Sequence, residues 1–357
     1  MRKKFDEIFE DCTKLGTKIK TDEYHSNGKH PIIDQGQEMV AGFTDLEDGL
    51  FDAVPAIVFG DHTRIIKYVD YPFFLGADGV KVLRSKVPNA NYRYLYYALK
   101  NAKIPNTGYN RHYKWLKELE IEYPPISQQI KTVKVLDEVE SIIHNRQNQL
   151  QKLDELVKAR FVEMFGDCKS MVSMNELCSI ITDGTHQPPR FQESGIPFIF
   201  VSNLVGNVVT YNAEKFISED TYAELYKRTP IEIGDLLLST VGSYGHPAVV
   251  TEDRKFLFQR HIAYLKPRHN MVNSFYLHSA LLAPDGQRQI EEKVKGIAQK
   301  TLNLSEIKKI AVPLPTIEEQ NQFEKFVNQT DKSKVAVQKS LDEAQLLFDS
   351  LMQQYFG

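Results

Sequence analysis

The sequence contains few of the residues that build covalent or metal-held cores. Its three cysteines, Cys12, Cys168 and Cys178, do not have the spacing of zinc ligands, so we expect reduced structural thiols in a cytoplasmic protein. No apolar run approaches the roughly 20 residues of a membrane helix. The first twelve residues, "MRKKFDEIFEDC", lack the apolar core of a secretory signal. We therefore expect no membrane partner.

The motifs of common enzyme classes are also missing. No Gly-rich loop joins a strand to a helix, which excludes the usual nucleotide cradles. The stretch "HQPPR" (186–190) has the two prolines of an amino-methyltransferase motif but neither its amide or acid nor its ring. Asp285, Glu291 and Lys293 imitate a nuclease signature, but the acids lie six residues apart in a helix-like stretch and cannot share a metal ion. The ten histidines are scattered. We predict a non-catalytic chain with no metal and no cofactor of its own.

Basic charge is unevenly distributed along a chain whose net charge is only −3. Residues 64–117 hold eleven Lys or Arg and two Asp, a local +9, whereas residues 1–63 carry a local −6. Residues 254–309 hold eleven basic and four acidic residues, a local +7. One basic segment in each half of the chain favours a polyanionic partner such as DNA.

The chain repeats itself. "YPPISQQ" at Tyr123–Gln129 returns as "LPTIEEQ" at Leu314–Gln320, an offset of 191 that also aligns Phe165-Gly166 with Phe356-Gly357. Upstream, an offset of 182 aligns "DGVKVL" with "RHIAYL", and one insertion of nine residues reconciles the two offsets. Two matching blocks in the same order predict a duplicated unit, a globular part followed by a helix.

Each repeat ends in a run of about forty residues with helical periodicity. Apolar residues recur every seven positions from Leu136 to Met164 and again, broken at Lys334, from Val327 to Tyr355. Neither run contains Pro or an internal Gly, and Thr316 with Glu319 forms a capping box. Two helices of matched register predict an antiparallel pair; amphipathic helices that lie on globular cores are the alternative.

The remaining sequence is typical of mixed α/β domains. Short β-rich runs such as "AIVFG" (56–60), "IPFIFV" (196–201), "DLLLSTVG" (235–242) and "HPAVVT" (246–251) alternate with polar loops, and helical stretches follow at Tyr92–Lys103 and Tyr276–Leu282. We predict an α+β fold with two pseudo-twofold-related mixed α/β domains separated by two long antiparallel helices that form a coiled coil. The expected segments are a first recognition domain (1–124), a central helix (125–166), a second recognition domain (167–314) and a C-terminal helix (315–357).

Polar loops beside the basic segments supply the side chains that read and hold DNA. Arg can form two hydrogen bonds to guanine, Asn or Gln can pair with adenine, and Lys and Tyr can bind phosphates. Each loop alone could be an ordinary surface turn, but their recurrence beside both basic segments favours nucleic acid. The candidate DNA-binding residues are His62, Arg64, Tyr109, Asn110, Arg111, His112, Lys114, Thr185, His186, Gln187, Arg190, Ser243, Tyr244, His246, Arg260, Gln299 and Lys300.

Together these motifs resemble those of the specificity subunit of Type I restriction–modification systems. The resemblance covers essentially the whole chain and rests on the two Pro-x-x-x-x-Gln motifs, on "GYNRHYKWLKELEIEYPP" (108–125), and on "ITDGTHQPP", "GIPFIFVSNL" and "GDLLLSTVGSYG" (181–189, 195–204 and 234–245). The first half departs from the pattern, because it has no copy of "ITDGTHQPP".

The resemblance implies a DNA-recognition role. Each domain would read one half of a split double-stranded DNA site, and the paired helices would hold the domains apart and bind two modification (methyltransferase) subunits. S-adenosylmethionine would belong to those subunits, and ATP and Mg would belong to the restriction/translocase subunits of the full complex. The alternative is a non-catalytic coiled-coil scaffold or adaptor whose domains bind protein.

Overall fold

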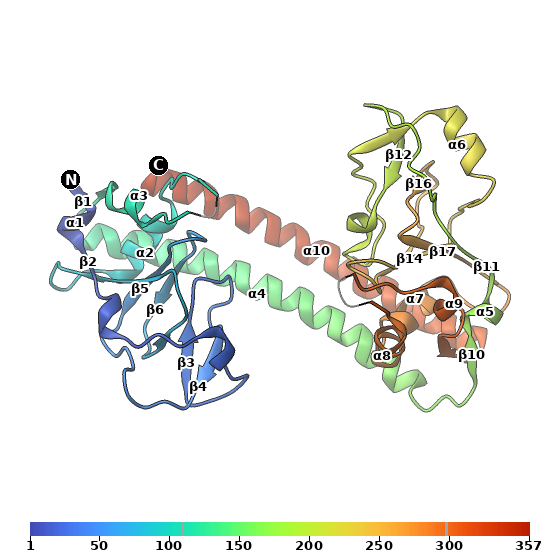
Figure 1. Ribbon diagram of the computed structural model, residues 1–357, viewed down its shortest axis with the longest axis horizontal. Coiled ribbons are helices and arrows are strands. Elements are labelled where there is room, and N and C mark those ends of the chain that lie inside the picture. Colours follow the sequence, from blue (N-terminus) through green and yellow to red (C-terminus); the bar gives the residue numbers. More distant parts are fainter. Residues whose placement is uncertain (109, 297–298) are drawn as a thin grey trace. The chain divides into compact units, whose positions relative to one another are not determined.

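The computed structural model describes residues 1–108, 110–296 and 299–357, and the chain divides into two compact units (Figure 1). Unit 1 comprises Met1–Gln147 and Lys339–Gly357, and unit 2 comprises Asn148–Gln338. Both termini therefore belong to unit 1. No helix of the described residues is long and apolar enough to cross a membrane.

Two helices of 40 residues each contribute to both units. They are α4 (Ile126–Phe165) and α10 (Ile317–Phe356), and at 1.5 Å per residue each is about 60 Å long. The helices expected from the seven-residue repeat are thus confirmed. The capping box is confirmed as well: the Thr316 amide donates to Glu319 Oε2 at 2.9 Å, and the Glu319 amide donates to Thr316 Oγ1 at 3.4 Å.

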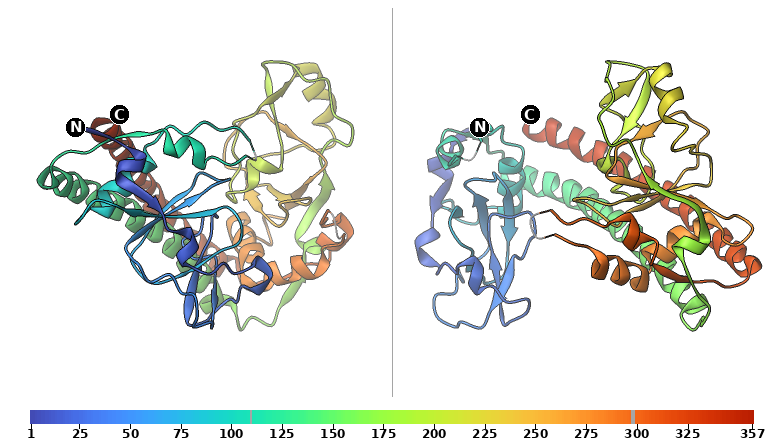
Figure 2. Two further views of the ribbon diagram at one scale, coloured as in Figure 1. Left: turned by 60° about the vertical axis from the view of Figure 1, so that its left-hand side comes forward. Right: turned by 45° about the vertical axis from the view of Figure 1, so that its right-hand side comes forward.

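Within each unit the two helices run in opposite directions. In unit 1, Leu136 near the start of α4 shares a core with Phe348 and Met352 near the end of α10. In unit 2, Phe161 and Phe165 at the end of α4 share a core with Phe323 at the start of α10. Figures 1 and 2 show the green and red helices side by side in both units. The predicted antiparallel pairing is confirmed.

Unit 1 contains a four-stranded sheet of order β2-β8-β5-β6, a three-stranded sheet of order β4-β3-β7 and the pair β1-β9. Helix α2 packs on β5 and β6. The bounds are β1 (Arg2–Lys4), α1 (Phe5–Ile8), β2 (Phe9–Asp11), η1 (Thr13–Leu15), η2 (Thr21–Glu23), β3 (His30–Ile33), β4 (Gly42–Thr44), β5 (Ala56–Gly60), β6 (Ile66–Val69), β7 (Phe74–Leu75), β8 (Val80–Ser85), α2 (Tyr92–Lys100), α3 (Tyr113–Lys117) and β9 (Glu120–Glu122).

Unit 2 repeats this plan. Its sheets have the orders β11-β17-β14-β15 and β13-β12-β16, with the pair β10-β18, so the repeat seen in the sequence is a repeat of topology. The bounds are β10 (Met171–Ser173), α5 (Met174–Leu177), β11 (Cys178–Asp183), β12 (Ile196–Ile199), η3 (Val201–Leu204), β13 (Lys215–Ile217), α6 (Glu219–Leu225), β14 (Leu236–Ser239), β15 (Pro247–Val249), β16 (Leu257–Phe258), β17 (Ile262–Pro267), α7 (Ser274–Leu282), α8 (Pro284–Lys293), α9 (Leu304–Ile307) and β18 (Ala311–Pro313).

Some elements are shorter than expected. Helix α2 ends at Lys100 rather than Lys103, because the chain turns at Asn101 and reaches Pro105, which cannot continue a helix. Strand β12 ends at Ile199, where the chain enters η3, and β15 covers only Pro247–Val249 of the β-rich run 246–251. The periodicity of apolar residues and the local composition locate these elements in the sequence, but they do not determine the residues at which the elements end.

The Pro-x-x-x-x-Gln motif forms a hydrogen bond at the start of each long helix. Gln129 Nε2 donates to the Pro124 carbonyl at 2.8 Å, and Gln320 Nε2 donates to the Pro315 carbonyl at 3.0 Å. Both glutamine side chains are buried. A proline carbonyl just before a helix has no intrahelical donor, so the glutamine five residues later satisfies it and fixes the direction in which the chain enters.

Candidate nucleic-acid interface

Part of the basic charge counted in the sequence is neutralised inside each unit. In unit 1, Lys67 pairs with Asp34, Lys81 with Asp11, and Arg93 and Lys100 with Glu140. The cations at 255, 266, 288, 295, 300 and 309 of unit 2 also have carboxylate partners. Within the described ranges, Lys103, Arg111, Lys114 and Arg190 are among the exposed cations that have no carboxylate partner, so they are available for an external anion.

In unit 2, Asp183 at the end of β11 organises one group of predicted residues. Its Oδ1 accepts a hydrogen bond from Arg228 Nη2 at 2.6 Å, and its Oδ2 lies 3.0 Å from His186 Nε2. The Asp183 side chain is 17% exposed, whereas His186 is 54% exposed. The carboxylate therefore orients an exposed imidazole and an exposed guanidinium from two different segments.

The backbone fastens this loop to a neighbouring one. The Arg260 amide donates to the Thr185 carbonyl at 3.1 Å, and the Thr185 amide donates to the Phe258 carbonyl at 3.1 Å. A Cβ on Gly184 would lie 2.3 Å from the Phe258 oxygen, so this approach requires glycine. Arg260 and His186 are thereby carried by loops that lie against each other.

A pocket of about 290 Å³ lies beside these loops. Two predicted residues, Arg260 and Gln299, line it, and so do Asp183 and His261. Burial and the neighbouring Arg260 lower the pKa of His261, so its imidazole is neutral at neutral pH. The pocket thus presents a guanidinium, an amide and a neutral imidazole, which are groups that hydrogen-bond to base edges.

Tyr244 and Lys300 come from different loops and are joined by Glu291 of α8. Lys300 Nζ lies 3.0 Å from Glu291 Oε1 and 3.2 Å from the Tyr244 hydroxyl, which donates to Glu291 Oε2. These hydrogen bonds lower the pKa of Glu291. The carboxylate holds both predicted contacts in one place and cancels the charge of Lys300.

The other predicted residues of unit 2 differ in how exposed they are to a binding partner. Ser243, Gln187 and Arg190 are exposed. His246 is half-buried and points inward, since its Nδ1 lies 3.0 Å from Asn207 Oδ1. His246 is therefore held within the unit rather than presented to a partner.

In unit 1, His112 holds a loop in place. Its side chain is fully buried, its Nδ1 lies 3.0 Å from the Asp61 carbonyl oxygen, and its amide donates to the same oxygen at 2.8 Å. Asp61 Oδ1 accepts from the Tyr113 amide at 2.7 Å. The loop that contains His62 is thus locked to the segment that begins α3, and a buried His112 positions its neighbours without contacting a partner itself.

The exposed neighbours of His112 are the available contacts of unit 1. Asn110, Arg111 and Lys114 are exposed, whereas His62 and Arg64 are half-buried. Arg64 Nη1 donates to the Ile104 carbonyl at 3.2 Å, which ties the loop after β5 to the segment that precedes Arg111. Tyr109 lies outside the described residues.

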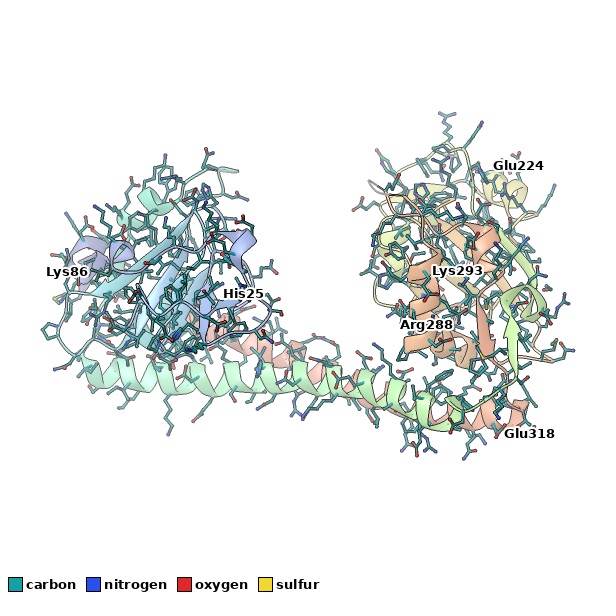
Figure 3. All side chains as sticks on the ribbon, turned by 60° about the horizontal axis from the view of Figure 1, so that its bottom comes forward. His25, Lys86, Glu224, Arg288, Lys293 and Glu318 are labelled. Carbon is teal, nitrogen blue, oxygen red and sulfur yellow. The ribbon has the colours of Figure 1, made fainter. Side chains whose placement is uncertain are left out.

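Sequence reasoning missed four residues that organise these loops: Asp61, Asp183, Arg228 and Glu291. Asp183 lies inside the quoted "ITDGTHQPP", so its place was visible, but its partner Arg228 lies 45 residues away. In the sequence, Glu291 stands out only through the imitated nuclease signature. It lies on α8, as do the labelled Arg288 and Lys293 (Figure 3), and no group of metal-binding side chains occurs among the described residues.

Comparison with known proteins identifies the family to which these features belong. The family model described as Type I restriction modification DNA specificity domain matches residues 1–154 and 170–344. The chain is 31% identical over 170 residues to the specificity subunit of the Type I restriction enzyme EcoBI of Escherichia coli, which covers 48% of this chain and 36% of that protein. It is 22% identical over 189 residues to a putative Type I specificity subunit, MjaX, of Methanocaldococcus jannaschii, which covers 51% of this chain and 44% of that one. The matches thus span less than half of these relatives.

Solved structures share the fold. The S subunit of a Type I restriction–modification system from M. genitalium superposes with a TM-score of 0.57 at 16% identity, covering 100% of this chain and 96% of that one. A chain from a structural study of assembly and conformational transition in the type I R-M system gives a TM-score of 0.54 at 17% identity, covering 100% and 97%.

Proposed function

Because the chain belongs to the family of Type I restriction modification DNA specificity domains, we propose that it is the DNA-specificity subunit of a Type I restriction–modification complex. The observation that carries this proposal is the duplication: both units repeat one topology, and in each unit exposed polar and cationic side chains lie on loops that an aspartate, Asp61 or Asp183, holds in place. A duplicated reader suits a double-stranded DNA target with two half-sites.

Unit 1 would read one half-site through Asn110, Arg111 and Lys114, and unit 2 would read the other through the loops around Arg190 and Arg260. Phosphate contacts from the free cations give salt-dependent attachment without sequence preference. Base contacts then discriminate, and each good pair of hydrogen bonds contributes roughly 1–3 kcal/mol. We propose that the pocket beside Arg260 and Gln299 contributes to base recognition.

The helices would recruit the modification subunits and set the spacing of the half-sites. Several large apolar side chains on them are half or more exposed, among them Ile130 and Leu346 in unit 1 and Val335 in unit 2. Scattered exposed apolar residues are ordinary, but a set on two paired helices is suited to a protein partner. We assign S-adenosylmethionine and methyl transfer to those partners, and ATP and Mg to the restriction subunits, so this chain carries out no chemistry itself.

The proposal is tested by co-expressing the chain with its modification subunits and mapping methylated sites. We expect a bipartite site, and lengthening both long helices by one turn should lengthen its unread spacer while both half-sites stay unchanged. Altered half-sites with an unchanged spacer would contradict the role of the helices in spacing. A chain that binds no modification subunit and shows no salt-dependent DNA affinity would be the scaffold instead.

The recruiting surface can be tested separately. Leu346→Asp places a charge on an exposed apolar position of α10 and should weaken capture of the modification subunits. Lys339→Ala, at another exposed position of the same helix, is the matched control. Equal loss in both variants would argue against an apolar docking surface.

A further inference from the structure

The two units correspond residue by residue where the long helices meet the domains. The Tyr94 hydroxyl donates to the Glu122 carbonyl at 2.9 Å in unit 1, and the Tyr276 hydroxyl donates to the Pro313 carbonyl at 2.7 Å in unit 2. The Tyr94 ring contacts Phe356, and the Tyr276 ring contacts Phe165. Residues of α2 therefore correspond to residues of α7 at an offset of 182. Residues of α4 correspond to residues of α10 at an offset of 191.

In unit 1 this region is filled by a tyrosine. Tyr97 of α2 is fully buried, and its ring centroid lies 6.1 Å from that of Phe348. Its hydroxyl lies 2.6 Å from Asp137 Oδ1 and 3.0 Å from Glu140 Oε2. The aromatic ring fills the space between α2 and the helix pair, and carboxylates of α4 bind its hydroxyl group.

In unit 2 the counterpart positions carry smaller residues: Ser279 replaces Tyr97, and Val157 replaces Phe348. A phenol ring and a phenyl ring are therefore absent. In their place a cavity of about 350 Å³ extends from the helix pair to α7 and the segment 206–209. Ser279 and Val157 both line it.

Unit 1 has a hollow at the matching place, but it does not reach as far inward. That hollow, of about 470 Å³, is lined by residues of the helix pair and the end of α2, including Lys100, Glu140 and Phe348. Tyr97 does not line it. Ser279 thus lines the cavity of unit 2, whereas its counterpart Tyr97 does not line the hollow of unit 1.

The walls of the unit 2 cavity suit an aromatic ring that carries a hydroxyl group. Val157, Phe161, Phe275 and Val327 form apolar walls. Asp331, which is the counterpart of Glu140, also lines the cavity. Lys334 Nζ lies 3.3 Å from Asp331 and 2.7 Å from Asp154 at the same site.

Ser279 adds a polar group to these walls. The residue is only 6% exposed and lines the cavity, so its hydroxyl group is placed to hydrogen-bond to a molecule that occupies the cavity.

We propose that this cavity of unit 2 binds a small aromatic molecule that carries a hydroxyl group. The ring would occupy the space that Tyr97 fills in unit 1, and the hydroxyl would meet Asp331 or Ser279. The volume lies within the roughly 300 to 1,000 Å³ of small-molecule pockets and exceeds the about 150 Å³ that holds benzene in an engineered cavity. The inference is independent of the proposed DNA-specificity function.

The test is titration of the full chain with p-cresol, followed by calorimetry and thermal unfolding. We expect saturable binding and a rise in Tm with ligand concentration, because the ligand binds only the folded state. Toluene, which lacks the hydroxyl, should bind more weakly, since it cannot hydrogen-bond to Asp331 or Ser279. Ser279→Tyr should lower p-cresol affinity at least about tenfold, which corresponds to about 1.4 kcal/mol.

Ser279→Ala leaves the cavity open, so it should lower p-cresol affinity less than Ser279→Tyr does. The control is Lys332→Ala, an exposed change on α10 outside the cavity lining, which should retain p-cresol binding. If Ser279→Tyr does not fold, Val157→Phe restores the other unit 1 ring and should also block binding. Absence of saturable p-cresol binding to the wild-type chain would overturn the proposal, as would equal binding by the wild type and both filled variants. DNA binding without p-cresol is measured in parallel, so failure of the cavity and failure of the DNA-specificity function give different results.

Discussion

Unit 1 and unit 2 pack the same elements against the long helices with different chemistry. Unit 1 uses a half-buried polar network in which Arg93 and Tyr97 contact Asp137 and Glu140. Unit 2 places Phe275 and Ser279 at the positions of Arg93 and Tyr97 and leaves a cavity. A duplicated fold thus conserves its hydrogen-bonded supports while the side chains between them diverge.

The largest expected effect on stability comes from replacing Tyr97 of unit 1 with serine, which is the residue at the matching position of unit 2. Tyr97→Ser removes a buried ring and leaves Asp137 and Glu140 without their phenol partner, so the free energy of unfolding of unit 1 should fall by about 3–5 kcal/mol. Urea denaturation followed by Trp115 fluorescence reports this directly, because the only tryptophan lies in unit 1. Ser279→Ala in unit 2, followed by far-UV circular dichroism, is the control and should change stability by less than about 0.5 kcal/mol. Similar losses in the two variants would contradict the contrast between the units.

The glutamines at the starts of the two long helices should also differ in how much they contribute to stability. Gln320 contacts three backbone groups, since it donates to the Met271 and Pro315 carbonyls and accepts from the Asn273 amide. Gln129 donates only to Pro124, and its buried Oε1 has no partner among the described residues. At about 1 kcal/mol per hydrogen bond, Gln320→Ala should cost about 3 kcal/mol and Gln129→Ala about 1 kcal/mol. Hydrogen exchange of the first turns of α10 and α4 measures each loss, and the reverse order would refute this account.

Acid should weaken the network of unit 1. Burial raises the pKa of Glu140, but Lys100 and Arg93 outweigh burial and lower it below its ordinary value of 4.5. A carboxylate with a depressed folded-state pKa stabilises the fold above its unfolded pKa, and this contribution is lost as the pH falls through the folded value. Unit 1 should therefore lose stability below about pH 4.5, and Glu140→Gln should reduce that dependence. Glu138→Gln, an exposed change on the same helix, should leave the pH profile of Trp115 fluorescence unaltered.

The smallest expected effect concerns Glu291. Replacing it with Gln frees the charge of Lys300 for a phosphate, so non-specific DNA affinity should rise a few-fold and the salt dependence should steepen by about one unit. Glu292→Gln, beside it and paired with Arg288, is the matched control for a change of charge. An unchanged salt slope in Glu291→Gln would show that Lys300 does not contact DNA.

The sequence predicted the structural features that depend on local sequence patterns and on the internal repeat. The heptad runs, the capping box and the duplicated topology are all present. Features that depend on contacts between distant side chains were not predictable. Asp183 meets Arg228, and Glu291 meets Lys300, only once the chain is folded. The net charge of a segment likewise could not reveal how many of its cations are already paired.

Selection of DNA sites by the modification complex most directly tests the claim that each unit reads one half of a split target. Arg111→Ala in unit 1 and Arg190→Ala in unit 2 remove exposed cations that have no carboxylate partner among the described residues. We predict that each variant relaxes base preference in a different half-site, while the other half and the spacer stay unchanged. Relaxation of the same positions by both variants, or a wild-type site without two separate halves, would contradict the account.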